Sequence, residues 1–209
     1  MASWVVLGKR AARPARWLLC ATLAGHLFFL NGCGDGGNTA PPGADLDGLL
    51  AAGKLAEAEK LCRELVRKDD TRANLHRGNL ARVLCLRGDA VLKAAGFFDP
   101  DPKKAEEARK SERYRAGVKY FQEAEEVSRG VLDHPGKSGK VELAKVRATL
   151  GLAVYRQDGL KRAKEAVRQL KQAVAEGDRL GAAHNTLGLI YYDYGEREKA
   201  VTHFRAALQ

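Results

Sequence analysis

The chain has 209 residues, of which 45% are apolar and 7% aromatic, with a formal net charge of +10. This length predicts one domain with an appendage, and the apolar share is ample for a core. Ala, Leu, Glu, Lys and Arg dominate, and alternating Val, Ile and Thr are nearly absent after residue 45. We therefore expect an all-α protein, and the composition argues against sheet-rich fold classes.

The first 30 residues have the layout of a targeting segment. A basic run from Lys9 to Arg16 precedes an apolar run of 14 residues, Trp17 to Leu30. A helix that spans a membrane needs about 20 apolar residues, so this run has instead the length of a signal-peptide core.

Leu30-Asn31-Gly32-Cys33 follows directly and resembles the lipobox of bacterial lipoproteins. The resemblance implies a signal peptide over residues 1–32, cleavage after Gly32, and acylation of Cys33 with lipid chains such as palmitate. The protein would then be anchored to a membrane by lipid and face the periplasm or the outside of a bacterial cell. An ordinary secretory signal and an uncleaved anchor are the alternatives.

Residues 33–45 contain the candidate lipidated cysteine and a linker rich in Gly and Pro. These residues disfavour regular structure, and the linker has no large apolar side chain to bury. We expect a flexible tether before a helical domain over residues 46–209.

Near the C-terminus, small and large residues alternate at helical spacing. Gly188 and Ala200 are small residues where two helices could meet, and large side chains lie beside them. Close-packed helices need this complementarity. The full pattern consists of Leu187, Gly188, Tyr191, Ala200 and Phe204.

This pattern resembles the tetratricopeptide repeat, although His184 stands where that family usually has a large apolar residue. Gly151 and Ala163 begin the same spacing in an earlier unit, and Ala58 and Cys62 belong to a first unit that lacks a full leading helix. The resemblance implies a short α-solenoid of antiparallel helix pairs.

A second unit begins near Thr71, and its second helix comes late. Apolar positions stay on one face through Gly88, so we expect its first helix to run to about Ala95. A turn at residues 99–102 and one charged helix from Lys103 to about Leu132, with Glu106 and Lys110 paired, complete an elongated helical hairpin. A break at residues 88–89 with a short extra helix is the alternative.

First helices of successive repeats line a concave groove that binds peptides or partner helices. By resemblance, the groove residues of this chain are Asn79, Arg82, Lys145, Leu152, Tyr155, Asn185, Leu189 and Tyr192. The implied function is a membrane-anchored protein–protein interaction scaffold of the bacterial envelope. An envelope protein that binds or cleaves cell-wall glycan through the long hairpin is the alternative.

Other chemistry finds little support in the sequence. No nucleophile–base pair, phosphate loop or metal-ligand spacing is present, so we expect no enzyme, cofactor, nucleotide or metal. Bases and acids alternate along the charged helix, which disfavours nucleic acid as a partner. Cys62 and Cys85 fall on helices that are expected to be neighbours, where an oxidising compartment would permit a disulfide and ordinary burial of free thiols is the other reading.

Overall fold

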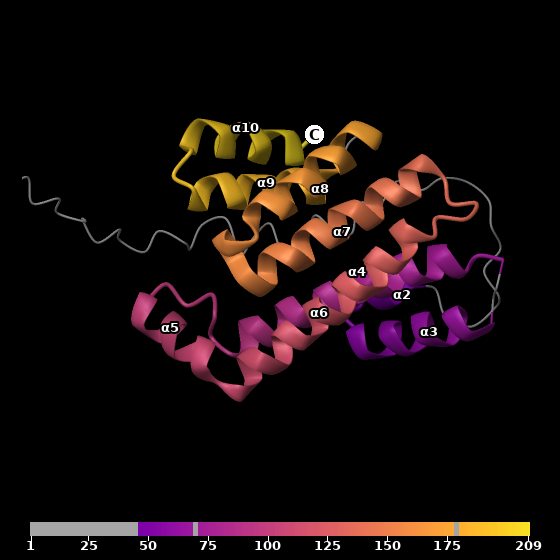
Figure 1. Ribbon diagram of the computed structural model, residues 1–209. Helices are drawn as coiled ribbons and strands as arrows, with labels where there is room; N and C mark the ends of the chain where they lie inside the picture. Colours follow the sequence, from indigo (N-terminus) through magenta and orange to yellow (C-terminus); the bar gives the residue numbers. More distant parts are fainter. Residues whose placement is uncertain (1–45, 69–70, 178–179) are drawn as a thin grey trace, which may run out of the picture.

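The computed structural model describes residues 46–68, 71–177 and 180–209, so Cys33 and the predicted targeting segment lie outside the described residues. Within the described ranges the chain forms nine α-helices and one 3-10 turn, and it contains no strand. The helices pack as neighbouring pairs (Figure 1). The predicted all-α array of antiparallel helix pairs is confirmed.

The first pair is short, as predicted for a unit without a full leading helix. Helix α2 covers Leu46–Ala51 and helix α3 covers Leu55–Lys68. Gly53 has a φ of 70° in the turn between them, a left-handed conformation that glycine adopts without strain. Ala58 and Cys62 of α3 are fully buried, at 0% and 1% exposure.

The elongated hairpin consists of α4 (Ala73–Ala94) and α6 (Glu112–Asp133). Helix α4 is continuous through Gly88, so the alternative break at residues 88–89 is wrong. The ring of Phe121 lies 2.6 Å from where a Cβ atom of Gly88 would stand. Gly88 is thus needed for close packing of the two helices and does not interrupt the first one.

The single charged helix predicted from Lys103 to about Leu132 is wrong, because Ser111 divides it. Helix α5 covers Pro102–Lys110, and Ser111 has extended backbone angles before α6 begins. The Ser111 hydroxyl accepts a hydrogen bond from the backbone N–H of Tyr114 and donates one to the carbonyl of Ala108. The Ser111 side chain therefore pairs with a backbone carbonyl at the end of α5 and with a backbone N–H at the start of α6. Glu106 pairs with Arg109, at 3.0 Å, in place of the expected Lys110.

Two further pairs complete the fold. Helices α7 (Lys140–Asp158) and α8 (Ala163–Glu176) are joined by the 3-10 turn η1 (Gly159–Lys161), and α9 (Gly181–Asp193) pairs with α10 (Arg197–Ala207). A Cβ atom at Gly151 would stand 2.6 Å from Leu170, and one at Gly188 would stand 2.6 Å from Phe204. The other repeat residues Ala163, Leu187, Tyr191 and Ala200 are buried.

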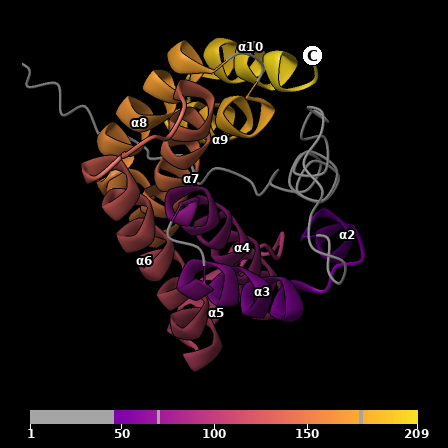
Figure 2. The same ribbon diagram turned by 90° about the vertical axis from the view of Figure 1, so that its right-hand side faces the viewer.

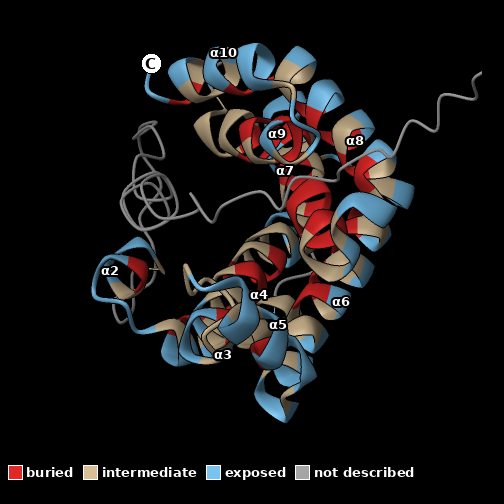
Figure 3. Ribbon diagram, turned by 90° about the vertical axis from the view of Figure 1, so that its left-hand side faces the viewer, coloured by how far each residue is buried: buried red, intermediate tan, exposed pale blue. Residues whose placement is uncertain are grey.

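The pairs follow an arc with two rows of helices (Figure 2). Helices α2, α4, α7 and α9 form the inner row, while α3, α6, α8 and α10 form the outer row. Consecutive inner helices α4, α7 and α9 contact one another. Helix α7, in the middle, is buried along much of its length (Figure 3).

A network of charges ties the outer row to α7. Glu125 of α6 accepts hydrogen bonds from Arg129, Gln157 and Arg162, and the two arginines also pair with Glu165 of α8. Burial acts to raise the pKa of Glu125, but these hydrogen bonds outweigh it and hold the pKa at about 2. Charged partners therefore fix α6, α7 and α8 relative to one another.

We expect Gly151→Ala to be destabilising, because the added Cβ meets the buried Leu170 side chain and lies 3.2 Å from the backbone oxygen of Ala166. Overpacking of this kind costs about 1–3 kcal/mol. Gly130→Ala is the matched control, since Gly130 also lies in a helix and no atom is within 4 Å of its Cβ position. Chemical denaturation followed by circular dichroism measures both. Equal free energies of unfolding for the two variants would show that the close approach at Gly151 is not a constraint.

Candidate functional site

The eight residues predicted to line a groove all lie on three inner helices. Asn79 and Arg82 are on α4, Lys145, Leu152 and Tyr155 are on α7, and Asn185, Leu189 and Tyr192 are on α9. These helices are parallel neighbours, because each is the first member of an antiparallel pair. The structure therefore brings the three groups of residues to one side of the molecule.

The contacts of α7 with other helices show which of its residues lie between α4 and α9. Gln157 contacts α6, Gly151 contacts α8, Tyr155 contacts α9 and Arg156 contacts α4. With 100° between successive residues, Val141 and the residues four, seven and eleven positions later share the sector of α7 between Tyr155, which contacts α9, and Arg156, which contacts α4.

Residues at the same helical spacing on α4 and α9 extend this sector of α7 into a continuous inner stripe. We define the inner stripe as Leu75, Asn79, Arg82 and Leu86 of α4, Val141, Lys145, Ala148 and Leu152 of α7, and Asn185, Leu189 and Tyr192 of α9. Seven of the eight predicted residues belong to it. Tyr155 is the eighth and lies at its edge.

Burial differs strongly along the inner stripe. Leu152 is 6% exposed and Ala148 is 7% exposed, so neither offers much surface. Val141, by contrast, is 56% exposed, Tyr192 is 39% exposed and Leu75 is 36% exposed. The accessible apolar surface of the stripe therefore lies near the N-terminal ends of α4 and α7 and the C-terminal end of α9.

Tyr155 serves packing between helices, because its hydroxyl donates a hydrogen bond to the carboxylate of Asp193 on α9. Burial raises the pKa of Tyr155 well above its usual range, so the hydroxyl keeps its proton. Burial also raises the pKa of Asp193, while the hydrogen bond from Tyr155 acts in the opposite direction. The side chain joins α7 to α9 and is only 6% exposed.

Three polar groups of the inner stripe have no partner among the described residues. They are the side-chain amides of Asn79 and Asn185 and the ammonium group of exposed Lys145, one on each of the three inner helices. Arg82 differs from these three groups, because it interacts with the carboxylate of Asp47 on α2. Burial lowers the pKa of Arg82, and this carboxylate acts against that shift. The stripe thus presents two hydrogen-bonding amides and one cation for contact with another molecule.

A second polar cluster, which the sequence did not indicate, lies at the C-terminal ends of α4 and α7. Asp89 and Arg156 form an ion pair with 3.0 Å between Oδ1 and Nε, and the Arg156 guanidinium lies 5.1 Å from the centroid of the Phe98 ring. Burial raises the pKa of Asp89, opposed by the charge of Arg156. The sequence does not mark this pair, because both helices carry several charged residues.

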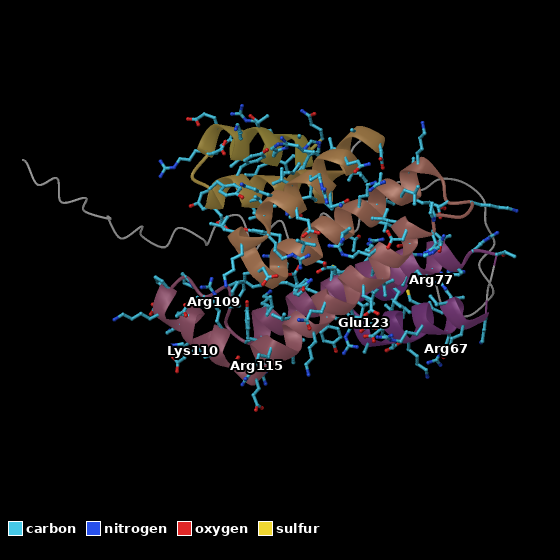
Figure 4. The ribbon with its side chains drawn as sticks, in the orientation of Figure 1. Arg67, Arg77, Arg109, Lys110, Arg115 and Glu123 are labelled. Atoms are coloured by element: carbon cyan, nitrogen blue, oxygen red, sulfur yellow. The ribbon has the colours of Figure 1, made fainter. Side chains whose placement is uncertain are left out.

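Two groups of exposed cations lie at opposite ends of the hairpin formed by α4 and α6. Arg67 and Arg77 lie at the end where α3 leads to α4, and Arg109, Lys110 and Arg115 lie around α5 and the start of α6 (Figure 4). Glu123 of α6 pairs with Arg63 at 2.7 Å.

Cys62 and Cys85 are both buried free thiols, so no disulfide joins α3 to α4. Burial raises the pKa of Cys62 to about 11, which keeps this thiol protonated. Within the described residues, no group of three or more His, Cys, Asp or Glu side chains is placed to hold a metal ion. No helix in the same part of the chain is long and apolar enough to cross a bilayer.

Comparison with protein-family models, with curated proteins and with solved structures finds no match.

We expect Tyr155→Phe to lower the free energy of unfolding by about 1–3 kcal/mol, because it leaves the half-buried carboxylate of Asp193 without its hydroxyl donor. Tyr120→Phe is the control, since the Tyr120 ring contacts Arg87 but its hydroxyl forms no hydrogen bond with any described residue. Denaturation in urea at neutral pH compares the two. Wild-type stability in Tyr155→Phe would mean that the hydroxyl bond does not hold α7 and α9 together.

Proposed function

We propose that this protein is a lipid-anchored scaffold of the bacterial envelope, built from tetratricopeptide-like repeats, that binds a peptide segment of a partner protein along the inner stripe. The observation that carries the proposal is a polar side chain without a partner among the described residues on each of three consecutive inner helices, Asn79, Lys145 and Asn185, beside exposed apolar side chains.

This set of groups suits a polypeptide. A side-chain amide can both donate and accept, so Asn79 and Asn185 can pair with the peptide backbone whatever the sequence of the partner. Val141, Tyr192 and Leu75 offer apolar surface for the partner's side chains, and a tyrosine ring provides contact area at low cost in conformational entropy. Lys145 favours a segment that carries an acidic group at this point.

The anchor is supported by the sequence Leu30 to Cys33 and by the Gly- and Pro-rich linker after it. Lipid chains contribute about 0.8 kcal/mol per buried CH₂, so several chains on Cys33 would hold the domain at a membrane. The linker would let the inner stripe face a partner above the bilayer.

The anchor predicts that Cys33→Ala will move the protein from the membrane fraction to the soluble fraction of lysed cells. The expected change is nearly complete, because the folded domain described here has no spanning helix. Fractionation with detection by immunoblot measures it, and mass spectrometry of the wild-type N-terminus checks for acyl chains. Membrane association that survives the substitution would point to an uncleaved N-terminal helix.

The binding face is tested by site-specific photocrosslinking in intact cells, with the crosslinker at Val141 or at Val201. The two valines are exposed to similar extents, 56% and 47%, but Val141 is on inner helix α7 and Val201 is on outer helix α10. We expect a discrete protein adduct at Val141 only. The double substitution Asn79→Ala with Asn185→Ala should reduce this adduct by about tenfold or more, since two hydrogen-bonding groups worth about 1 kcal/mol each are lost.

Three results would speak against the scaffold. An adduct of equal yield at Val201 would place binding elsewhere, and an adduct insensitive to the double substitution would exclude the inner stripe. Recovery of glycan in place of protein would favour the cell-wall alternative.

A further inference from the structure

Two histidines face each other across the last helix pair. His184 of α9 and His203 of α10 have their Nδ1 atoms 3.0 Å apart, which is hydrogen-bond distance. The Tyr191 ring stacks on the His203 ring, with 5.3 Å between centroids and 5° between the planes. Both imidazoles are partly exposed, so protons from solvent can reach them.

The Nδ1–Nδ1 contact sets a limit on how many protons the pair can hold. When both rings are neutral, one Nδ1–H donates to the lone pair of the other Nδ1. A first added proton can enter at Nε2 of the donor ring, and the contact survives as a charge-assisted hydrogen bond. A second added proton must enter at the accepting Nδ1, which places two N–H groups against each other and breaks the contact.

The surroundings of the pair add positive charge. Lys171 of α8 acts on His203 from the neighbouring pair, whereas Lys199 of α10, which lies 5.4 Å from the centroid of the Tyr191 ring, is paired with Glu196. No carboxylate contributes to the shift of either histidine. Burial lowers the pKa of His184, and burial followed by the charges of His184 and Lys171 lowers that of His203.

Metal binding is a poorer explanation of the same geometry. Transition-metal sites in proteins usually have three or four protein ligands. The described residues place no third His, Cys, Asp or Glu beside the pair, and the nearby lysines disfavour a cation.

Helix α10 is the part of the fold on which this contact has most effect. Among the described helices its main neighbour is α9 alone, whereas each earlier outer helix also contacts the inner helix of the next pair. Besides the histidine contact, α10 is held by the Phe204 ring against Gly188 and by Ala200 and Ala207. A change at His203 therefore acts directly on the contact of α10 with its main neighbour.

We propose that the His184–His203 contact is a proton-sensitive latch, which holds α10 on α9 at neutral pH and releases it when both imidazoles become protonated. Because the pKa values of both histidines are lowered in the folded protein, acid destabilises the contact. Above about pH 6.5, the pKa of a histidine in an unfolded chain, neither the latched nor the released form gains protons, and the latch contributes its full stability. As the pH falls below 6.5, the released hairpin can bind an added proton on each imidazole, whereas the latched pair can hold only one. The stability of α10 is therefore lost on acidification.

The experiment is hydrogen–deuterium exchange of the full-length protein between pH 7.5 and pH 5, corrected for the intrinsic pH dependence of exchange. We expect the protection of amides in 197–207 to fall by about tenfold or more, while that in α7 stays unchanged, because one pKa unit corresponds to a factor of ten in the opening equilibrium. His203→Gln should abolish this pH dependence, since glutamine does not titrate.

His134→Gln is the matched control and should retain the pH response, because His134 is exposed and lies outside this hairpin. If His203→Gln does not fold, His184→Gln and an NMR titration of the wild-type ring protons decide the matter. The latch is overturned if α10 protection does not depend on pH in the wild type, if the dependence persists without either histidine, or if both rings titrate at 6.5 or above.

Discussion

The fold depends on how closely the two helices of each pair can approach. In three successive pairs the inner helix has a glycine at the point of approach, Gly88, Gly151 or Gly188, and a large side chain of the outer helix occupies the place of the missing Cβ atom. A glycine inside a helix costs about 1 kcal/mol relative to alanine. Burial of Phe121 and Leu170 beside these glycines offsets that cost, since burying one such side chain contributes about 1.5–3 kcal/mol.

Close approach within the pairs does not by itself fix how one pair sits on the next. Apolar surfaces are non-directional, so neighbouring inner helices need polar contacts to set their register. The Asp89–Arg156 ion pair joins α4 to α7, and the Tyr155–Asp193 hydrogen bond joins α7 to α9. Both contacts lie near the C-terminal ends of these helices. These two contacts therefore fix how far the inner-stripe residues of the three helices are shifted along the helix axes relative to one another.

Much of the fold could be predicted from local sequence, because small residues at fixed spacing mark where paired helices touch. Seven of the eight groove residues implied by the repeat resemblance lie on the inner stripe, because the resemblance aligns one face of each inner helix. Ser111 was missed because the flanking segment is rich in good helix formers, and only its hydroxyl contacts with Ala108 and Tyr114 reveal the break. The partners of Tyr155 and His184 are 38 and 19 residues away, so no local pattern could indicate them.

The uneven burial of the inner stripe restricts how a segment could lie on it. On α7, Val141 and Lys145 are exposed, but Leu152 is closed off. On α9 the exposed residue is Tyr192, near the opposite end of a parallel helix. A bound segment that used both regions would have to cross the inner helices obliquely, from the N-terminal ends of α4 and α7 toward the C-terminal end of α9. Asn185 lies about two turns before Tyr192 on α9, next in the chain to His184 and the contact that holds α10. Loosening of the last pair would therefore act first on the α9 side of the proposed binding face and leave the α4 and α7 side in place.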